Sequence, residues 1–302
     1  MTARSAEPTQ PIEGDSMSEA TDVAAVRADC VADSAGGLTF HIADWARPEP
    51  GSYDNWNGAL VLMRRGAGPG EDGEVRLPLG PTADGRLQAA LPGTVALPEG
   101  RWDVFVAYGD QEPRRLAPGL HDLRSLVDRR PGPSTSPLSV RIPYATKHGN
   151  LSLRTWRRAP HAEAGEIRLD DGTMTAGGRL YQVESPADWL DGAVVEARCR
   201  RDPDLVRAAP VTADGAGFSF TLSYARFAES WGGGTDLWDL WLRPADDTAA
   251  PVRLARILDD VADKKEIFTY PARTVDAPHG TATVRPYYTV DNDLSVKVAD
   301  PD

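Results

Sequence analysis

The chain has 302 residues, which is long enough for two domains that each have their own hydrophobic core. Hydrophobic residues make up 41% and charged residues 26% of the sequence, as is usual for a globular protein. The formal net charge of −12 argues against a nucleic-acid partner, because neutralising phosphates requires a basic face. No apolar run approaches the length of about 18 residues that a membrane span needs, so none is expected.

The first 36 residues are small, polar and acidic, and we expect a disordered tail over 1–36. They contain no apolar segment typical of a secretory signal. Met17 opens a stretch that also reads like a natural start, so Met1 and Met17 both stay open as the true first residue. Cys30 would lie in this tail, far from Cys199. The two cysteines therefore predict no disulfide framework and favour a reducing compartment.

Several blocks of sequence after the tail occur twice in the same order. TADGRLQAAL (82–91) is similar to TADGAGFSFTL (212–222), and RWDVFV (101–106) is similar to LWDLWL (237–242). Farther along, PYATKHGNLSLR (143–154) returns as PYYTVDNDLSVK (286–297). Each block alone is a weak signal, but matches in one order predict a tandem repeat.

Within the repeated blocks the hydrophobic period is two, as in Phe218, Phe220 and Leu222, which predicts half-buried strands. The Asp-Gly pairs of both TADG segments predict tight hairpin turns. The predicted fold class is therefore all-β, a tandem repeat of two antiparallel, immunoglobulin-like β-sandwich domains. The predicted division is a tail over 1–36, a first sandwich over 37–157, a linker over 158–164 and a second sandwich over 165–302.

The two long matching segments predict the last hairpin of each sandwich. KHGN and VDND would form the turns, and Leu151 and Leu294 would return to the core. Pro143 and Pro286 would lie near a strand start or on a sheet edge, where a missing N–H is tolerated. Short helices are expected only at 255–266 and, more weakly, at 120–130.

A search for catalytic or metal-binding patterns finds no nucleophile elbow, zinc motif or phosphate-binding loop. Asp291-Asn292-Asp293 spells a pair of carboxylates that could hold a divalent ion on a diphosphate, but these residues also favour a turn, and we prefer the turn. The glycine-rich segment 66–73 predicts a hairpin loop rather than a phosphate cradle. We predict no catalytic residue, metal or cofactor, and surface positions for all five histidines: His41, His121, His148, His161 and His279.

The tryptophans divide into rings that recur in both repeats and rings that do not. Trp102 and Trp238 recur, which favours a core position. The aromatic rings without a counterpart are free for another use, and the candidate ligand-binding residues are Trp45, Tyr53 and Trp231. Such rings can stack on a sugar or plug a loop, and the plug is the more common case. Paired arginines, such as 64–65, 114–115, 129–130, 157–158 and 200–201, could meet phosphate but more often form solvated faces.

The two closing segments resemble the end of β-sandwich accessory domains in actinobacterial cell-wall polymer synthases, which are found beside family 2 glycosyltransferase and teichoic-acid-type glycerophosphotransferase modules. The RWDVFV block (101–106) and the segment that begins with Arg114 fit the same pattern, so the resemblance covers most of 38–298. In such enzymes the chemistry lies in separate α/β domains. The resemblance thus implies no catalytic residue in this chain.

The first functional hypothesis is a non-catalytic accessory or binding protein in cell-surface polymer biosynthesis. Its implied partners are a glycosyl- or glycerophosphotransferase and a polysaccharide or polyol-phosphate ligand, and its expected location is cytoplasmic, at the inner face of the membrane through its partner. The alternatives are a transferase of that pathway with an unrecognised active site, and a structural protein-interaction module. A carboxylate cluster in a deep pocket would favour the first alternative, and a large apolar edge the second.

Overall fold

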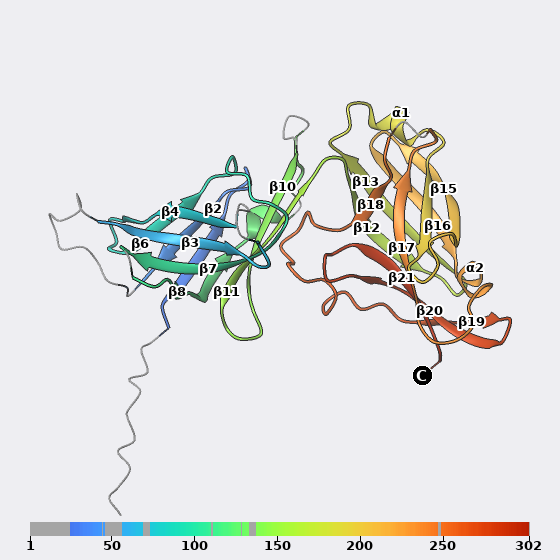
Figure 1. Cartoon of the computed structure of the whole chain (residues 1–302). Helices are drawn as coiled ribbons and strands as arrows, with labels where there is room; N and C mark the ends of the chain where they lie inside the picture. Colours follow the sequence, from blue (N-terminus) through green and yellow to red (C-terminus); the bar gives the residue numbers. More distant parts are fainter. Residues whose placement is uncertain are drawn as a thin grey trace, which may run out of the picture.

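A computed structural model of the chain describes residues 25–43, 45, 56–68, 73–109, 111–127, 129–132, 137–246 and 249–301. Its regular structure is almost entirely β, in two halves that lie side by side (Figure 1). The N-terminal half runs from β1 to β11 and the C-terminal half from β12 to β21. The predicted all-β class is therefore confirmed. The predicted immunoglobulin-like form is not, as the pairing of the strands shows.

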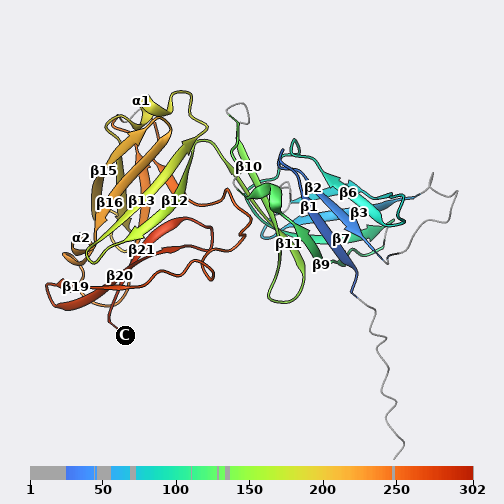
Figure 2. The same ribbon diagram turned by 180° about the vertical axis from the view of Figure 1, so that it is seen from behind.

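The N-terminal half consists of two separate sheets. One has the order β5-β6-β2-β1-β9 and the other the order β10-β11-β7-β3-β4, with β8 paired to β7. Figure 2 labels β1, β2, β6 and β9 of the first sheet, in which β1 and β9 pair in parallel. The bounds are β1 (Arg27–Ala32), β2 (Leu38–Ile42), β3 (Gly58–Arg64), β4 (Glu74–Pro78), β5 (Gly80–Pro81), β6 (Leu87–Leu91), β7 (Gly100–Tyr108), β8 (Arg114–Arg115), β9 (Ala117–Asp122), the 3₁₀ turn η2 (Arg124–Leu126), β10 (Leu138–Ala145) and β11 (Leu151–Arg158).

The C-terminal half closes seven strands into a barrel. The order is β14-β15-β16-β13-β12-β18-β17, and β17 pairs back onto β14, while β21, β20 and β19 continue from β17. The bounds are β12 (His161–Leu169), β13 (Thr173–Tyr181), α1 (Pro186–Leu190), β14 (Val194–Cys199), β15 (Val206–Asp214), β16 (Gly217–Ser223), α2 (Tyr224–Ala228), β17 (Asp236–Arg243), β18 (Val252–Ala255), β19 (Arg273–Ala277), β20 (Gly280–Tyr288) and β21 (Leu294–Ala299).

The pairings of the two halves nevertheless follow the same order. β1 with β2, β2 with β6 and β7 with β11 correspond to β12 with β13, β13 with β16 and β17 with β21. Each half also contains one parallel pair, β1–β9 and β12–β18, so the expectation of purely antiparallel sandwiches is wrong.

The halves differ because two strands are continuous in only one of them. β15 pairs with both β14 and β16, and β18 pairs with both β12 and β17, so these two strands connect the layers. The N-terminal counterparts are interrupted. Leu79 separates β4 from β5, between two prolines that cannot donate to a ladder, and Leu116 separates β8 from β9. The N-terminal sheets consequently remain open at these positions.

Each half has its own hydrophobic core. Trp102 is fully buried in the N-terminal core and Trp238 in the C-terminal core, as their recurrence predicted. Leu151 and Leu294 are likewise buried, which confirms that both closing hairpins return to the core. The N-terminal core also receives Ile257 from the segment after β18, which reaches across towards β11 in Figure 1.

The structure differs from two of the predicted boundaries. Residues 25–36 of the predicted tail are described, and β1 there buries Cys30 in the core, where burial and the neighbouring Asp29 charge raise the pKa of the thiol. The predicted linker over 158–164 is mostly strand, because β12 begins at His161. Residues 1–24 lie outside the described residues. Both cysteines are free and buried.

The helix predicted over 255–266 is absent, and η2 is the only helical segment among the described residues of the weaker candidate over 120–130, whose first residues belong to β9. The backbone N–H groups of Ile257 and Leu258 donate instead to the Glu163 carboxylate at 2.9–3.1 Å. The backbone N–H of Lys264 donates to the Asn292 side chain at 3.1 Å. The Asn292 side chain, in the turn between β20 and β21, thus accepts an N–H that a helix over 255–266 would use internally. No helix in the described part of the chain is long and apolar enough to cross a membrane.

Candidate functional site

The Asp291-Asn292-Asp293 motif lies in the β20–β21 turn, at the junction of the two halves. Asp291 forms an ion pair with Arg154, and Asp293 forms one with Arg158 at 3.1 Å. Both arginines belong to β11 of the N-terminal half. The indole of Trp156 also donates to the backbone oxygen of Asp291 at 3.2 Å. The two carboxylates of the motif therefore hold the halves together.

The middle residue of the motif fixes the segment that follows β18. Asn292 adopts a positive φ of 61°, and its amide donates to the backbone oxygens of Val261 and Ala262 at 3.3 Å. Burial raises the pKa of Asp293, while the charges of Arg158 and Arg253 oppose this change. The turn interpretation is confirmed. Within the described residues, no group of three or more His, Cys, Asp or Glu side chains is placed to hold a metal ion.

A polar network occurs at the same register position in each half. In the N-terminal half, Asp103 on β7 accepts a hydrogen bond from Ser152 at 3.0 Å and pairs with Arg65 and Arg115. Burial raises the pKa of Asp103, but the hydrogen bond from Arg65 and the Arg115 charge outweigh burial and leave it lowered.

In the C-terminal half, Asp239 on β17 accepts a hydrogen bond from Ser295 at 3.0 Å and pairs with Arg200 at 2.8 Å and Arg253 at 2.6 Å. Several of the paired arginines in the sequence are thus used in ion pairs inside the protein rather than on a purely solvated face.

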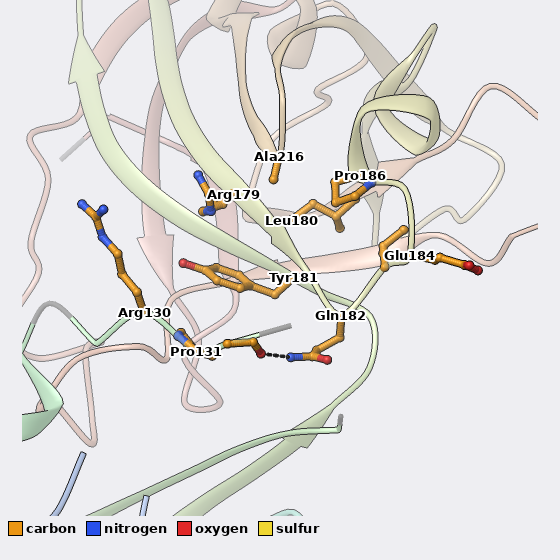
Figure 3. Close-up of a pocket in the computed structure, with 11 residues that line it drawn as sticks. Arg130, Pro131, Arg179, Leu180, Tyr181, Gln182, Glu184, Pro186 and Ala216 are labelled. Atoms are coloured by element: carbon orange, nitrogen blue, oxygen red, sulfur yellow. Dashed lines mark hydrogen bonds between the residues drawn. The ribbon is translucent and has the colours of Figure 1, made fainter. Parts of the chain in front are cut away.

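A pocket of about 810 Å³ is lined by both halves (Figure 3). Arg130 and Gly132 come from the segment after η2, and Arg179 and Tyr181 come from the end of β13. The side-chain amide of Gln182 donates to the backbone oxygen of Gly132 at 3.4 Å and so connects the two walls. Figure 3 shows both guanidinium groups on the same side of the pocket as the Tyr181 hydroxyl.

Tyr181, the aromatic residue of this pocket, packs against a buried histidine. The Tyr181 ring stacks on buried His161, with 6.4 Å between ring centroids, and the guanidinium carbon of Arg179 lies over the Tyr181 ring, 5.9 Å from its centroid. His161 is fixed by a 2.7 Å contact with Glu163. His161 is therefore a core residue, contrary to the predicted surface position. Burial raises the pKa of Tyr181, while the positive charge of Arg179 opposes the rise.

The charges of the pocket suit an anionic ligand. Arg130 and Arg179 are exposed, and neither forms an ion pair with a residue that the structure describes. A guanidinium group binds two oxygens of a phosphate or carboxylate at once. Tyr181 adds an amphipathic ring of the kind that packs against sugar or polyol carbons. The acidic lining residue, Glu184, lies at the other end of the pocket from Arg130.

The three predicted ligand-binding rings are not brought together. Trp45 packs edge-to-face on Trp56, with centroids 6.0 Å apart, in the N-terminal half. Trp231 is only 4% exposed, belongs to the C-terminal core and donates to the backbone oxygen of Gly234 at 3.2 Å. The plug interpretation therefore holds for Trp231, whose ring has no face open to a ligand. Tyr53 lies outside the described residues, and ligand binding at Trp45 and Tyr53 stays a prediction.

Sequence reasoning missed Arg179 and Tyr181 as site residues. They lie on a strand without a recognised motif, and Arg130 was noted only as one of a pair. The pocket forms because two segments about 50 residues apart meet, which one-dimensional patterns do not reveal. The matching segments of the sequence both end in a cation, Arg154 and Lys297, and this was a readable signal of equivalent charged positions.

The chain matches no protein-family model and no curated protein. Among solved structures, a crystal structure of S. aureus TarS (217–571) is 15% identical, covers 67% of this chain and 56% of that chain, and has a TM-score of 0.29. A second crystal structure of S. aureus TarS is 13% identical, covers 70% of this chain and 37% of that chain, and also has a TM-score of 0.29. The chain thus spans less than two thirds of either structure. TM-scores this low do not establish a common fold or function.

Proposed function

We propose that this chain is a non-catalytic accessory protein of cell-surface polymer biosynthesis that binds an anionic polymer beside a glycosyl- or glycerophosphotransferase. The observation that carries the proposal is the pocket between the halves, where Arg130, Arg179 and Tyr181 meet. Two guanidinium groups that form no ion pair with a described residue suit the phosphates of a polyol-phosphate chain, and the tyrosine ring suits its carbons. The resemblance of the closing hairpins to accessory domains of polymer synthases supports the same class of ligand.

The junction of the halves supports a binding role for this pocket. Asp291 and Asp293 engage arginines of β11, and Ile257 enters the N-terminal core, so the two halves that line the pocket are held together at this joint. A pocket whose walls are held in place loses less conformational entropy when a ligand binds. The location proposed for this activity is the inner face of the membrane, reached through the transferase partner.

Titration with synthetic poly(glycerol phosphate) of defined length tests the proposal by calorimetry. The Arg130→Gln/Arg179→Gln variant should bind at least about tenfold more weakly, because charge-assisted hydrogen bonds contribute roughly 1.5–3 kcal/mol. Binding should also weaken as salt is added. The matched control is Arg114→Gln/Arg226→Gln, which removes one exposed arginine from each half outside the pocket.

Equal loss of affinity in the control would reduce the effect to net charge and contradict the assignment of the pocket. The proposed function itself would be contradicted if the unaltered protein did not bind the polymer at low salt, with the polymer at a millimolar concentration of phosphate groups. Turnover of nucleotide sugars or CDP-glycerol that is lost in Asp291→Ala/Asp293→Ala would instead support the transferase alternative.

A further inference from the structure

A second pocket, of about 360 Å³, lies wholly within the C-terminal half. Its walls come from β17, β20, β21 and the segment over 265–270. Its lining contains three cations and no acidic residue, and three aromatic rings lie among them. The charged and aromatic lining residues are Lys265, Arg285, Lys297, Phe268, Tyr270 and Tyr287.

The arrangement of the cations is unfavourable for the protein alone. Arg285 and Lys297 are direct cross-strand partners on β20 and β21, so their side chains share one face of the sheet. Like charges at opposed positions repel and destabilise the pair of strands. Lys265 adds a third positive charge at the same pocket. None of the three forms an ion pair with a residue in the described chain, although the whole sequence has an excess of 12 negative charges.

The N-terminal half shows what a cation at this register position binds. Lys297 pairs across strands with Leu237, one residue before the core Trp238, and Arg154 pairs with Arg101, one residue before Trp102. Arg154 thus occupies the position equivalent to Lys297. It binds the carboxylate of Asp291, and Arg101 donates to the backbone oxygen of Val290 at 3.1 Å. At this position of the fold, the N-terminal half holds an oxyanion.

The two positions differ in how the charges are distributed. On β11, Arg154 and Arg158 each meet a separate carboxylate of the acidic turn. In the C-terminal half, three cations line one small pocket. Convergent cations favour a phosphate over a lone carboxylate, because the arginine fork takes two oxygens while the ammonium groups act as point charges.

We propose that the pocket of Lys265, Arg285 and Lys297 binds a phosphodiester of a polyol-phosphate polymer. Tyr270 and Tyr287 would contact the polyol carbons on either side of the phosphate. This inference rests on the proposed function for the identity of the polymer, but it is carried by a separate set of residues. It gives the protein two anion-binding positions, so that one polymer chain can engage both and bind more tightly than at either alone.

The test uses the full chain, labelled with nitrogen-15, and two probes: inorganic phosphate and synthetic tetra(glycerol phosphate). Backbone amide shifts of 265–270 should move with both probes. In Arg285→Gln/Lys297→Gln, tetramer binding should weaken at least about tenfold, while the control Arg114→Gln/Lys147→Gln should stay within about twofold. Because the variant relieves repulsion, its thermal midpoint should equal or exceed that of the unaltered protein. Lys265 lies outside the strands, so Lys265→Gln should weaken binding without altering the pairing of the strands.

Unchanged tetramer affinity in both Arg285→Gln/Lys297→Gln and Lys265→Gln would overturn the inference and leave the proposed function standing. Tetramer shifts at 265–270 together with no binding of long polymer would support the site and contradict the proposed function. Tighter binding of an Asp-Asn-Asp turn peptide than of the tetramer, lost in Arg285→Gln/Lys297→Gln, would overturn the phosphodiester assignment in favour of a protein partner.

Discussion

In both halves, an aspartate on the central strand holds a serine of the last strand and two arginines, yet the next cation on that last strand has different surroundings. Asp103 and Ser152 are followed by Arg154, which binds a carboxylate of the other half. Asp239 and Ser295 are followed by Lys297, which lines a pocket. The polar network is common to both halves, whereas the cation beside it serves a different purpose in each.

This difference separates residues that build the fold from residues that are free to change. The network satisfies a partly buried aspartate and cannot lose a member without leaving a desolvated charge. The neighbouring cation is not part of this network, so its surroundings can differ between the halves. In the N-terminal half that oxyanion comes from the chain itself, through Asp291, and joins the halves.

The largest predicted effect concerns the equivalent tryptophans. Trp102→Ala and Trp238→Ala should each lower the free energy of unfolding by about 3–5 kcal/mol, because both rings are fully buried. The phenylalanine variants test the contribution of the indole N–H groups. The Trp102 indole donates to Thr155 at 3.1 Å, whereas the Trp238 indole N–H has no partner among the described residues. Trp102→Phe should therefore cost about 1 kcal/mol more than Trp238→Phe in urea unfolding. Equal costs would show that the hydrogen bond is immaterial.

A smaller effect is expected at the joint between the halves. Asp291→Ala leaves Arg154, whose side chain is only 6% exposed, without its carboxylate. Removing one partner of a fully buried pair costs roughly 3–5 kcal/mol, and because the Asp291 side chain is 52% exposed we expect about 2 kcal/mol. The measurement is urea unfolding followed by tryptophan fluorescence. The control is Asp276→Ala, an exposed aspartate on β19, and a loss of the same size there would contradict the role of the ion pair.

The strand content and both closing hairpins could be predicted from the sequence because they depend on local signals. Alternating hydrophobic residues and turn residues act over a few positions, and the two tryptophans were identified as core by their recurrence. The closure of seven strands into a barrel depends on whether one strand pairs on both sides. β15 pairs with both β14 and β16, and the alternation of hydrophobic residues within β15 does not indicate which strands lie beside it.

The candidate sites were less accessible to sequence reasoning for the same reason. Asn292 accepts the Lys264 N–H that a helix over 255–266 would use, from a position 28 residues later in the chain. Elimination across the repeat pointed to Trp231, but a ring without a counterpart can still be buried, as this one is. The cations of the two pockets lie on three different strands and in two loops, so only the assembled fold shows which of them meet.

The smallest predicted effect separates the two turns of the closing hairpins. In each turn, the backbone N–H of a threonine donates to the backbone oxygen of the residue four positions later at 2.8 Å. Each turn also has one residue at positive φ, Gly149 at 72° and Asn292 at 61°. Asparagine tolerates this conformation, so Gly149→Asn should change the free energy of unfolding by less than about 0.5 kcal/mol. Asn292→Gly keeps the backbone but removes the bonds to Val261, Ala262 and Lys264, and should cost about 1–2 kcal/mol. Urea unfolding of both variants gives the comparison. Equal costs would mean that the Asn292 side chain does not hold the joint and that the turns differ only in backbone preference.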